Sequence, residues 1–189
     1  MRAGIFTKAK SGGLIGLKPA VLPVVLLLLS GCMEAGSSTS TAATKPGVFQ
    51  ARYEKARAAL EAGKFDRAIS GYKALLPQAG PLAPRLQLEL AHAQLRNGDY
   101  AASAQAASAL AISQQGDARA AALAVQGVAQ HEMALAAIQA GRLDEAAGLL
   151  TQADKAMADV LKTNVEMDPL GALAARRAAI KVQKDRISS

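Results

Sequence analysis

The 189-residue sequence predicts an all-α domain of paired helices over residues 48–189. From Val48 onward the composition is dominated by Ala, Leu, Glu, Lys and Gln. Aromatic residues make up only 3% of the chain, which leaves few residues that favour strands. Apolar residues recur every three or four positions, as at Leu86, Leu90 and Ala93, and this is the spacing of a helix face. Because alanine-rich helices bury little area individually, we expect them to be stable only when packed together.

Three segments repeat one pattern, in which an apolar helix ends at a glycine and a second helix follows. The glycines are Gly63, Gly98 and Gly141, spaced by 35 and then 43 residues. The bulky residues two positions later are Phe65, Tyr100 and Leu143, and the small residues three positions further on are Ala68, Ser103 and Ala146. Glycine allows the first helix to end in a left-handed conformation. We expect the bulky residue to wedge between the helices and the small residue to lie where they cross.

This pattern resembles the tetratricopeptide repeat, a helix-turn-helix unit of about 34 residues. The resemblance implies a solenoid of helical hairpins with two clear repeats and a third, looser one. It also implies small residues at the crossing points of the first helices, namely Ala56, Ala91 and Ala134, and an aromatic residue at Tyr72. The tryptophan position of the family is held here by Arg52, Gln87 and Gln130.

The later helices are predicted from helix-stopping and helix-starting residues. A run without proline from Asp117 to Ala140 predicts one helix of about 24 residues with Asp117 as its N-cap. We expect its partner over about 143–163 and a last helix over about 170–187. The last helix is expected to cap the array with a polar outer face. Its basic residues, which form either a solvated face or a binding site, are Arg176, Arg177, Lys181 and Lys184.

The resemblance also implies a binding surface, because in tetratricopeptide proteins the first helix of each hairpin lines a concave groove that receives peptides or partner helices. The matching positions form a mixed-charge strip of Tyr53, Arg57, Glu89, His92, Arg96, His131 and Glu132. The lysine and asparagine set of the carboxylate-clamp subgroup is missing, so acidic C-terminal chaperone peptides are not expected as ligands. Two interpretations remain open: a partner-binding strip and an ordinary solvated surface.

The sequence contains no recognisable catalytic, metal or cofactor motif. His131-Glu132 begins like a zinc-protease motif, but Leu135 stands where the second histidine would be. No phosphate-cradling loop, dinucleotide fingerprint or nucleophile elbow is present. We therefore expect a protein that is not an enzyme and holds neither a metal nor a cofactor. An enzyme without a named constellation is the least favoured alternative.

The first 31 residues have the layout of a bacterial signal peptide, with four basic residues and no acidic one before a short apolar core at 20–29. That core is too short to span a bilayer. It ends in Leu29-Ser30-Gly31-Cys32, which contains the single cysteine of the chain. This stretch resembles the lipobox of bacterial lipoproteins. The resemblance implies cleavage before Cys32 and attachment of a diacylglyceryl group to its sulfur.

The expected organisation is therefore a lipoprotein signal peptide at 1–31, a flexible tether of small polar residues at 32–47 and the helical domain at 48–189. Met33 follows the cysteine where an aspartate would favour retention in the inner membrane. We therefore expect a lipid anchor in the outer membrane, on its periplasmic face, with the inner membrane as the alternative.

Charge indicates the kind of partner. Without the four basic residues of the signal peptide, the formal charge falls from +7 to +3. Basic residues predominate in 45–73 and 171–189, and acidic residues in 74–170. This distribution suggests contact with anionic headgroups or acidic protein surfaces, and nucleic acid is not expected as a partner of an exported protein.

Together these features predict a scaffold that binds other cell-envelope proteins and the membrane, the latter through the lipid on Cys32. The favoured setting is the assembly of a pilus, a secretion apparatus or an outer-membrane complex. The alternative is an adaptor that recruits peptidoglycan-remodelling enzymes.

Overall fold

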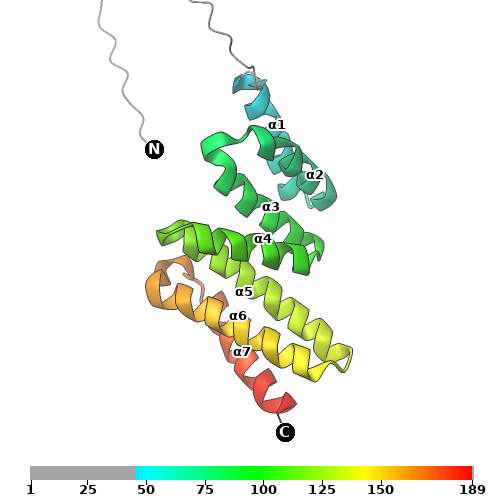
Figure 1. Ribbon diagram of the computed structural model, residues 1–189, viewed down its shortest axis with the longest axis vertical. Coiled ribbons are helices and arrows are strands. Elements are labelled where there is room, and N and C mark those ends of the chain that lie inside the picture. Colours follow the sequence, from blue (N-terminus) through cyan, green and yellow to red (C-terminus); the bar gives the residue numbers. More distant parts are fainter. Residues whose placement is uncertain (1–45, 189) are drawn as a thin grey trace, which may run out of the picture. The chain divides into compact units, whose positions relative to one another are not determined.

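The computed structural model describes residues 46–188, in which all regular structure is helical (Figure 1). The α-helices of this range are α1 (Pro46–Glu61), α2 (Phe65–Leu75), α3 (Ala83–Asn97), α4 (Tyr100–Ser113), α5 (Gly116–Gln139), α6 (Leu143–Thr163) and α7 (Ala172–Ile187). Three short 3₁₀ segments, Leu76–Gln78, Gly80–Leu82 and Val165–Met167, lie in the connections. The predicted all-α class is confirmed. The signal peptide and Cys32 lie outside the described residues, as does most of the tether.

The helices pack mainly in chain order. Each of α2 to α6 contacts the helix before it and the helix after it, and α3 also contacts α5 (Figure 1). Tight turns join α1 to α2, α3 to α4 and α5 to α6, so these pairs form hairpins. Within residues 46–188, no helix is both long and apolar enough to cross a membrane.

The three predicted glycine turns share one geometry. Gly63, Gly98 and Gly141 have φ values of +71°, +85° and +73°. At each turn the residue after the glycine donates its N–H to the carbonyl five positions earlier, as in Lys64 to Ala59 at 2.8 Å and Asp99 to Gln94 at 2.9 Å. This pairing satisfies carbonyls that the end of a helix would otherwise leave unbonded. The positive φ therefore accounts for the glycines.

The small residues predicted at the crossing points are buried. Ala68, Ser103 and Ala146 in the second helices are each 0% exposed, and Ala56, Ala91 and Ala134 in the first helices are at most 3% exposed. The Ser103 hydroxyl donates a hydrogen bond to the carbonyl of Ala91 at 2.8 Å, and this bond offsets the cost of burying the hydroxyl. One expectation at these turns is wrong. Leu143 starts α6 as predicted but is 44% exposed, so it does not wedge between its helices.

The long hairpin α5–α6 matches its predicted extent but not its predicted cap. The N-cap of α5 is Gln115, whereas Asp117 lies in the first turn. The Asp117 carboxylate instead accepts a hydrogen bond from the Asn164 side chain at 2.8 Å. The aspartate thus ties the start of α5 to the end of α6, a tertiary role that local sequence does not indicate.

The C-terminal helix α7 begins at Ala172, two residues later than expected, and leaves Leu170 94% exposed. Asp168 accepts hydrogen bonds from the N–H groups of Leu173 and Ala174, both at 3.0 Å. These backbone bonds, led by that from Leu173, lower the pKa of the Asp168 carboxyl. α7 then packs against α6 through the fully buried Ile180 and an ion pair between Arg177 and Asp154 at 2.7 Å.

Candidate functional site

Glu89 is the hub of the predicted strip. The carboxylate of this α3 residue accepts a hydrogen bond from the Tyr53 hydroxyl of α1 at 2.5 Å and another from the Tyr72 hydroxyl of α2 at 2.6 Å. The Arg85 guanidinium donates a third at 3.3 Å. Burial alone raises the pKa of Glu89, but the bonds from Tyr53, Tyr72 and Arg85 outweigh it, and the net pKa is lowered. Glu89 is therefore held as a carboxylate that joins three helices.

Tyr72 is the buried member of this cluster. The residue is 0% exposed, and its ring lies 6.3 Å from that of Tyr53 between centroids. Burial, followed by the negative charge and hydrogen bond of Glu89, raises the pKa of the Tyr72 hydroxyl far above its ordinary value. The hydroxyl thus remains a proton donor, and the aromatic residue that the repeat pattern predicts here has a structural role.

The exposed part of the strip is cationic. Arg57 and Arg96 are exposed, and the Arg96 guanidinium lies 5.3 Å from the centre of the Phe65 ring. His92 also reaches the surface, but partial burial of its ring lowers its pKa, and the positive charge of Arg96 lowers it further. Arg57 donates a hydrogen bond to the Glu61 carboxylate at 3.0 Å, which is the largest factor that raises the pKa of Arg57, and the hydrogen bond with Tyr53 is the next. Such guanidinium groups can pair with carboxylates of a partner.

His131 and Glu132 lie elsewhere. His131 is 4% exposed, and its Nε2 lies 2.8 Å from the side-chain oxygen of Gln183 in α7. Arg176 of α7 donates to Nδ1 of His131 at 3.1 Å and to the Glu132 carboxylate at 2.6 Å. Because a guanidinium can only donate, Nδ1 accepts and the ring proton lies on Nε2. His131 and Glu132 thus hold α7 against α5, and His131 is too buried to contact a partner.

The structure thus links five of the predicted strip residues, which are Tyr53, Arg57, Glu89, His92 and Arg96. Hydrogen bonds and close charges connect them across α1 and α3. Arg85 belongs to the same cluster, where it bonds Glu89 and lies 5.8 Å from the centre of the Tyr53 ring. Arg85 was not among the predicted strip residues, although its position four residues before Glu89 on a helix could have indicated the pair.

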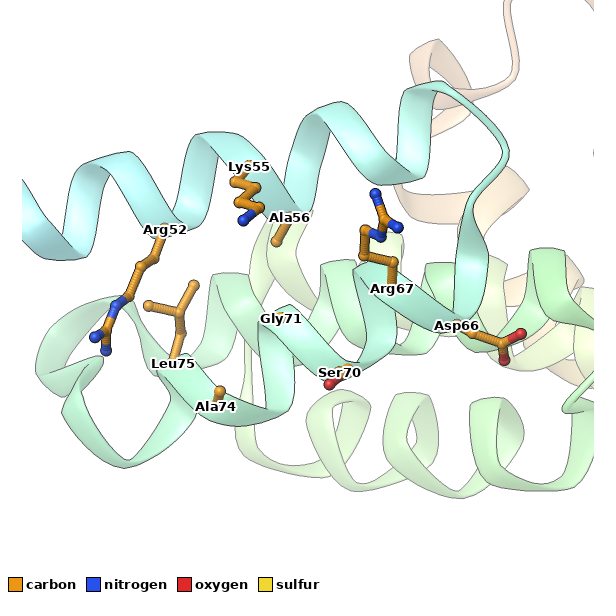
Figure 2. A pocket seen from close by; sticks show the side chains of 9 residues that line it. All are labelled: Arg52, Lys55, Ala56, Asp66, Arg67, Ser70, Gly71, Ala74 and Leu75. Carbon is orange, nitrogen blue, oxygen red and sulfur yellow. The ribbon is translucent and has the colours of Figure 1, made fainter.

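A second surface, a cleft between α1 and α2, was not predicted. The cleft has a volume of about 580 Å³. Nine residues line it, as Figure 2 shows: Arg52, Lys55 and Ala56 of α1 and Asp66, Arg67, Ser70, Gly71, Ala74 and Leu75 of α2. The excess of basic residues in 45–73 indicated a cationic region but not its shape. Gly71, in the middle of a predicted helix, was the local signal of a close helix approach.

The cleft combines an apolar floor with cationic walls. Ala56 and Leu75 are at most 3% exposed and lie at its base. Arg52, Lys55 and Arg67 are exposed and take part in none of the ion pairs between described side chains. The single acidic residue of the lining, Asp66, accepts a hydrogen bond from the Asn97 side chain at 3.1 Å.

Residues 46–188 contain no group of three or more His, Cys, Asp or Glu side chains placed to hold a metal ion. The arrangement offers hydrogen-bond donors and positive charge at two surfaces, and such surfaces can bind carboxylates. No protein-family model, curated protein or solved structure matches the chain.

Proposed function

We propose that this protein is a lipid-anchored scaffold of the cell envelope. In this proposal, Cys32 carries the lipid and residues 32–47 tether the domain to the outer membrane on its periplasmic face. The helices form a tetratricopeptide-like solenoid capped by α7, and they hold protein partners together during assembly of a pilus, secretion or outer-membrane complex. The protein would act by binding, not by catalysis.

The observation that carries the proposal is the threefold recurrence of one hairpin geometry. The turns at Gly63, Gly98 and Gly141 have the same backbone conformation, and the small residues around each turn are buried in the same way. A single hairpin of this kind cannot bury its apolar faces. Stacking several hairpins buries these faces and creates extended surfaces that suit protein binding.

The strip on α1 and α3 supports a binding role for one such surface. Arg57, His92 and Arg96 are exposed, while Tyr53 and Glu89 hold the two helices in register. Because the helices are fixed by internal bonds, the exposed side chains are presented from a rigid support. A rigid support lowers the entropic cost of binding a partner.

In-cell photo-crosslinking tests the proposal. A photoreactive amino acid in place of His92 should capture a discrete partner, and adding Arg96→Glu should greatly reduce that adduct. Lys162→Glu, which makes the same charge reversal at an exposed position on α6, is the matched control and should leave the adduct unchanged. The proposal fails if the adduct is absent, or if Arg96→Glu and Lys162→Glu have the same effect.

A further inference from the structure

The cleft between α1 and α2 lies on a hairpin that is covered on one side only. Every helix from α2 to α6 packs against both of its neighbours in the chain, whereas α1 packs mainly against α2. The described series of helices therefore begins with a groove that no other described helix fills. Since this groove runs between two packed helices, its shape suits a further helix.

The floor of the cleft is formed by small residues around Gly71, with Leu75 beside them. A Cβ atom at Gly71 would lie only 2.8 Å from the Cβ of Ala56, so the two helices are in direct contact there. Ala74 is exposed beside this contact. A ligand that fills the cleft can therefore place short apolar side chains against the floor, and burying them would stabilise the complex.

The walls determine the charge of the ligand. Figure 2 shows Arg52 and Arg67 toward opposite ends of the cleft, with Gly71 between them. Neither of these arginines nor Lys55 forms any of the ion pairs found in residues 46–188, and with Asp66 as the single acidic residue of the lining the cleft keeps an excess of positive charge. Carboxylates are the natural complement, because a guanidinium can bind one through two parallel hydrogen bonds.

Two other occupants fit the charge or the shape less well. The residues at 32–45 contain Glu34 as their single acidic side chain, which is too little negative charge for three cations. A second copy stacked end to end would bring α7 to the cleft, and α7 exposes Lys181 and Arg186. Like charges placed face to face oppose that contact.

A membrane surface is also disfavoured by geometry. Ala56 and Leu75 at the base of the cleft are at most 3% exposed, so a broad and nearly flat layer of headgroups cannot reach them. A narrow ligand can approach this recessed floor and the cationic walls at the same time. An amphipathic helix meets both requirements, because acidic residues can flank a stripe of alanine or leucine on one face.

We propose that the α1–α2 cleft is a docking site for an acidic amphipathic helix of a partner protein, with carboxylates on Arg52, Lys55 and Arg67 and small apolar side chains on the Gly71 contact. That the partner is a protein rests on the proposed scaffold function. The cleft itself is separate from the strip on α1 and α3.

Synthetic helical peptides test this proposal on the full chain purified in detergent. Three fluorescent peptides share one stripe of Ala and Leu and differ only in having Glu, Gln or Lys at the flanking positions. Fluorescence anisotropy should show that the Glu peptide binds about tenfold or more tightly than the Gln peptide, and that the Lys peptide does not bind.

Substitutions in the cleft identify the binding surface. The double variant Arg52→Gln with Arg67→Gln should bind the Glu peptide with about tenfold lower affinity. Ala74→Phe fills the floor at an exposed position without changing the charge, and it should lower the affinity for both the Glu and the Gln peptide. The matched control, Lys73→Gln with Lys162→Gln, removes the same charge from exposed positions outside the cleft and should change affinity by less than about twofold.

Four results would overturn the proposal. The first two are equal binding of the Glu and Gln peptides, and equal loss of affinity in the cleft and control variants. The third is displacement of the Glu peptide by soluble short-chain phosphatidylglycerol, which would assign the cleft to lipid. The fourth is a self-association in analytical ultracentrifugation that the arginine changes abolish, which would assign it to a second copy. Because these measurements use neither His92 nor Arg96, the proposed scaffold strip stands or falls separately.

Discussion

The carboxylate of Glu89 joins the first three helices through hydrogen bonds from Tyr53 and Tyr72. Its side chain is only 19% exposed, and the hydroxyl of Tyr72 is buried with it. A charged group in such surroundings is tolerated because several donors replace the water it has lost. The same bonds fix α1 against α3 and so determine how the exposed cations of the strip are presented.

Replacing this carboxylate by an amide tests its structural role. Glu89→Gln should lower the free energy of unfolding by about 1 to 3 kcal/mol at neutral pH, because the three charge-assisted bonds from Tyr53, Tyr72 and Arg85 are weakened or lost. Urea unfolding measures the effect, and Glu54→Gln on the exposed side of α1 is the control. An equal effect of both changes would contradict a central role for Glu89.

The pH dependence of this effect follows from the lowered pKa of Glu89. The stabilisation is fully present above the ordinary carboxyl value of 4.5 and is lost as the pH falls through the lower pKa of the folded protein. The stability difference between the wild type and Glu89→Gln should therefore shrink in acid. A difference that grows as the pH falls would show that the sign is wrong.

His92 reports on the electrostatics of the strip. Burial lowers its pKa first and the charge of Arg96 second, so Arg96→Gln should raise the pKa of His92 toward its ordinary value of 6.5 without restoring it fully. NMR titration of the ring protons measures this shift, and Lys73→Gln is the control for removal of one positive charge. An unchanged or lower pKa in Arg96→Gln would place Arg96 too far from His92 to affect it.

Among the helices, the α5–α6 hairpin is held by close packing at Gly127. A Cβ at Gly127 would lie 2.9 Å from Cγ of Met157 and 3.3 Å from the carbonyl oxygen of Ala153, both in α6. The backbone oxygen cannot move without shifting the helix. The close approach of α6, and not the backbone conformation, therefore favours glycine at this position, because a Cβ would force Met157 or the helix to shift.

Two alanine substitutions separate packing from helix propensity in this hairpin. Gly127→Ala should destabilise the domain by about 1 to 3 kcal/mol through overpacking. Gly148→Ala in α6 meets nothing within 4 Å and should stabilise the domain by about 1 kcal/mol, because alanine favours helix more than glycine does. Thermal and urea unfolding measure both changes. If the two variants had the same free energy of unfolding, that result would contradict the close approach of α5 and α6.

Local patterns predicted the turns and the bounds of the long hairpin because those features depend on residues near one another in the chain. Gly98 and the start of α6 at Leu143 are examples. Contacts between distant residues were not predictable in this way. The bond of Asp117 to Asn164 and the burial of His131 against α7 join residues 47 and 52 positions apart, respectively.

The binding surfaces show the same division. Repeat positions predicted Tyr53 and Glu89, which the structure brings together across α1 and α3. The cleft depends instead on how two helices cross at Ala56 and Gly71 and on which cations are left without partners. Neither property can be obtained from the spacing of residues in one helix.

The whole chain would combine two parts with different tasks in the proposed function. Residues 1–47 would place the protein at a membrane, and the helical domain would bind partners there. Confinement to a surface raises the effective concentration of partners at the same membrane, so even weak contacts at the strip or the cleft could hold an assembly together. This increase in effective concentration depends on the lipid at Cys32.

The mass of the mature chain, purified from the membrane fraction of a Gram-negative host, tests the lipid anchor most directly. Intact-mass and tandem mass spectrometry should find a chain that begins at Cys32, with a diacylglyceryl group on the cysteine sulfur. Stable attachment is expected because two or more acyl chains hold a protein at a bilayer, whereas one does so only marginally. A chain that begins elsewhere, or that carries a free thiol at Cys32, would contradict the proposed lipid-anchored scaffold.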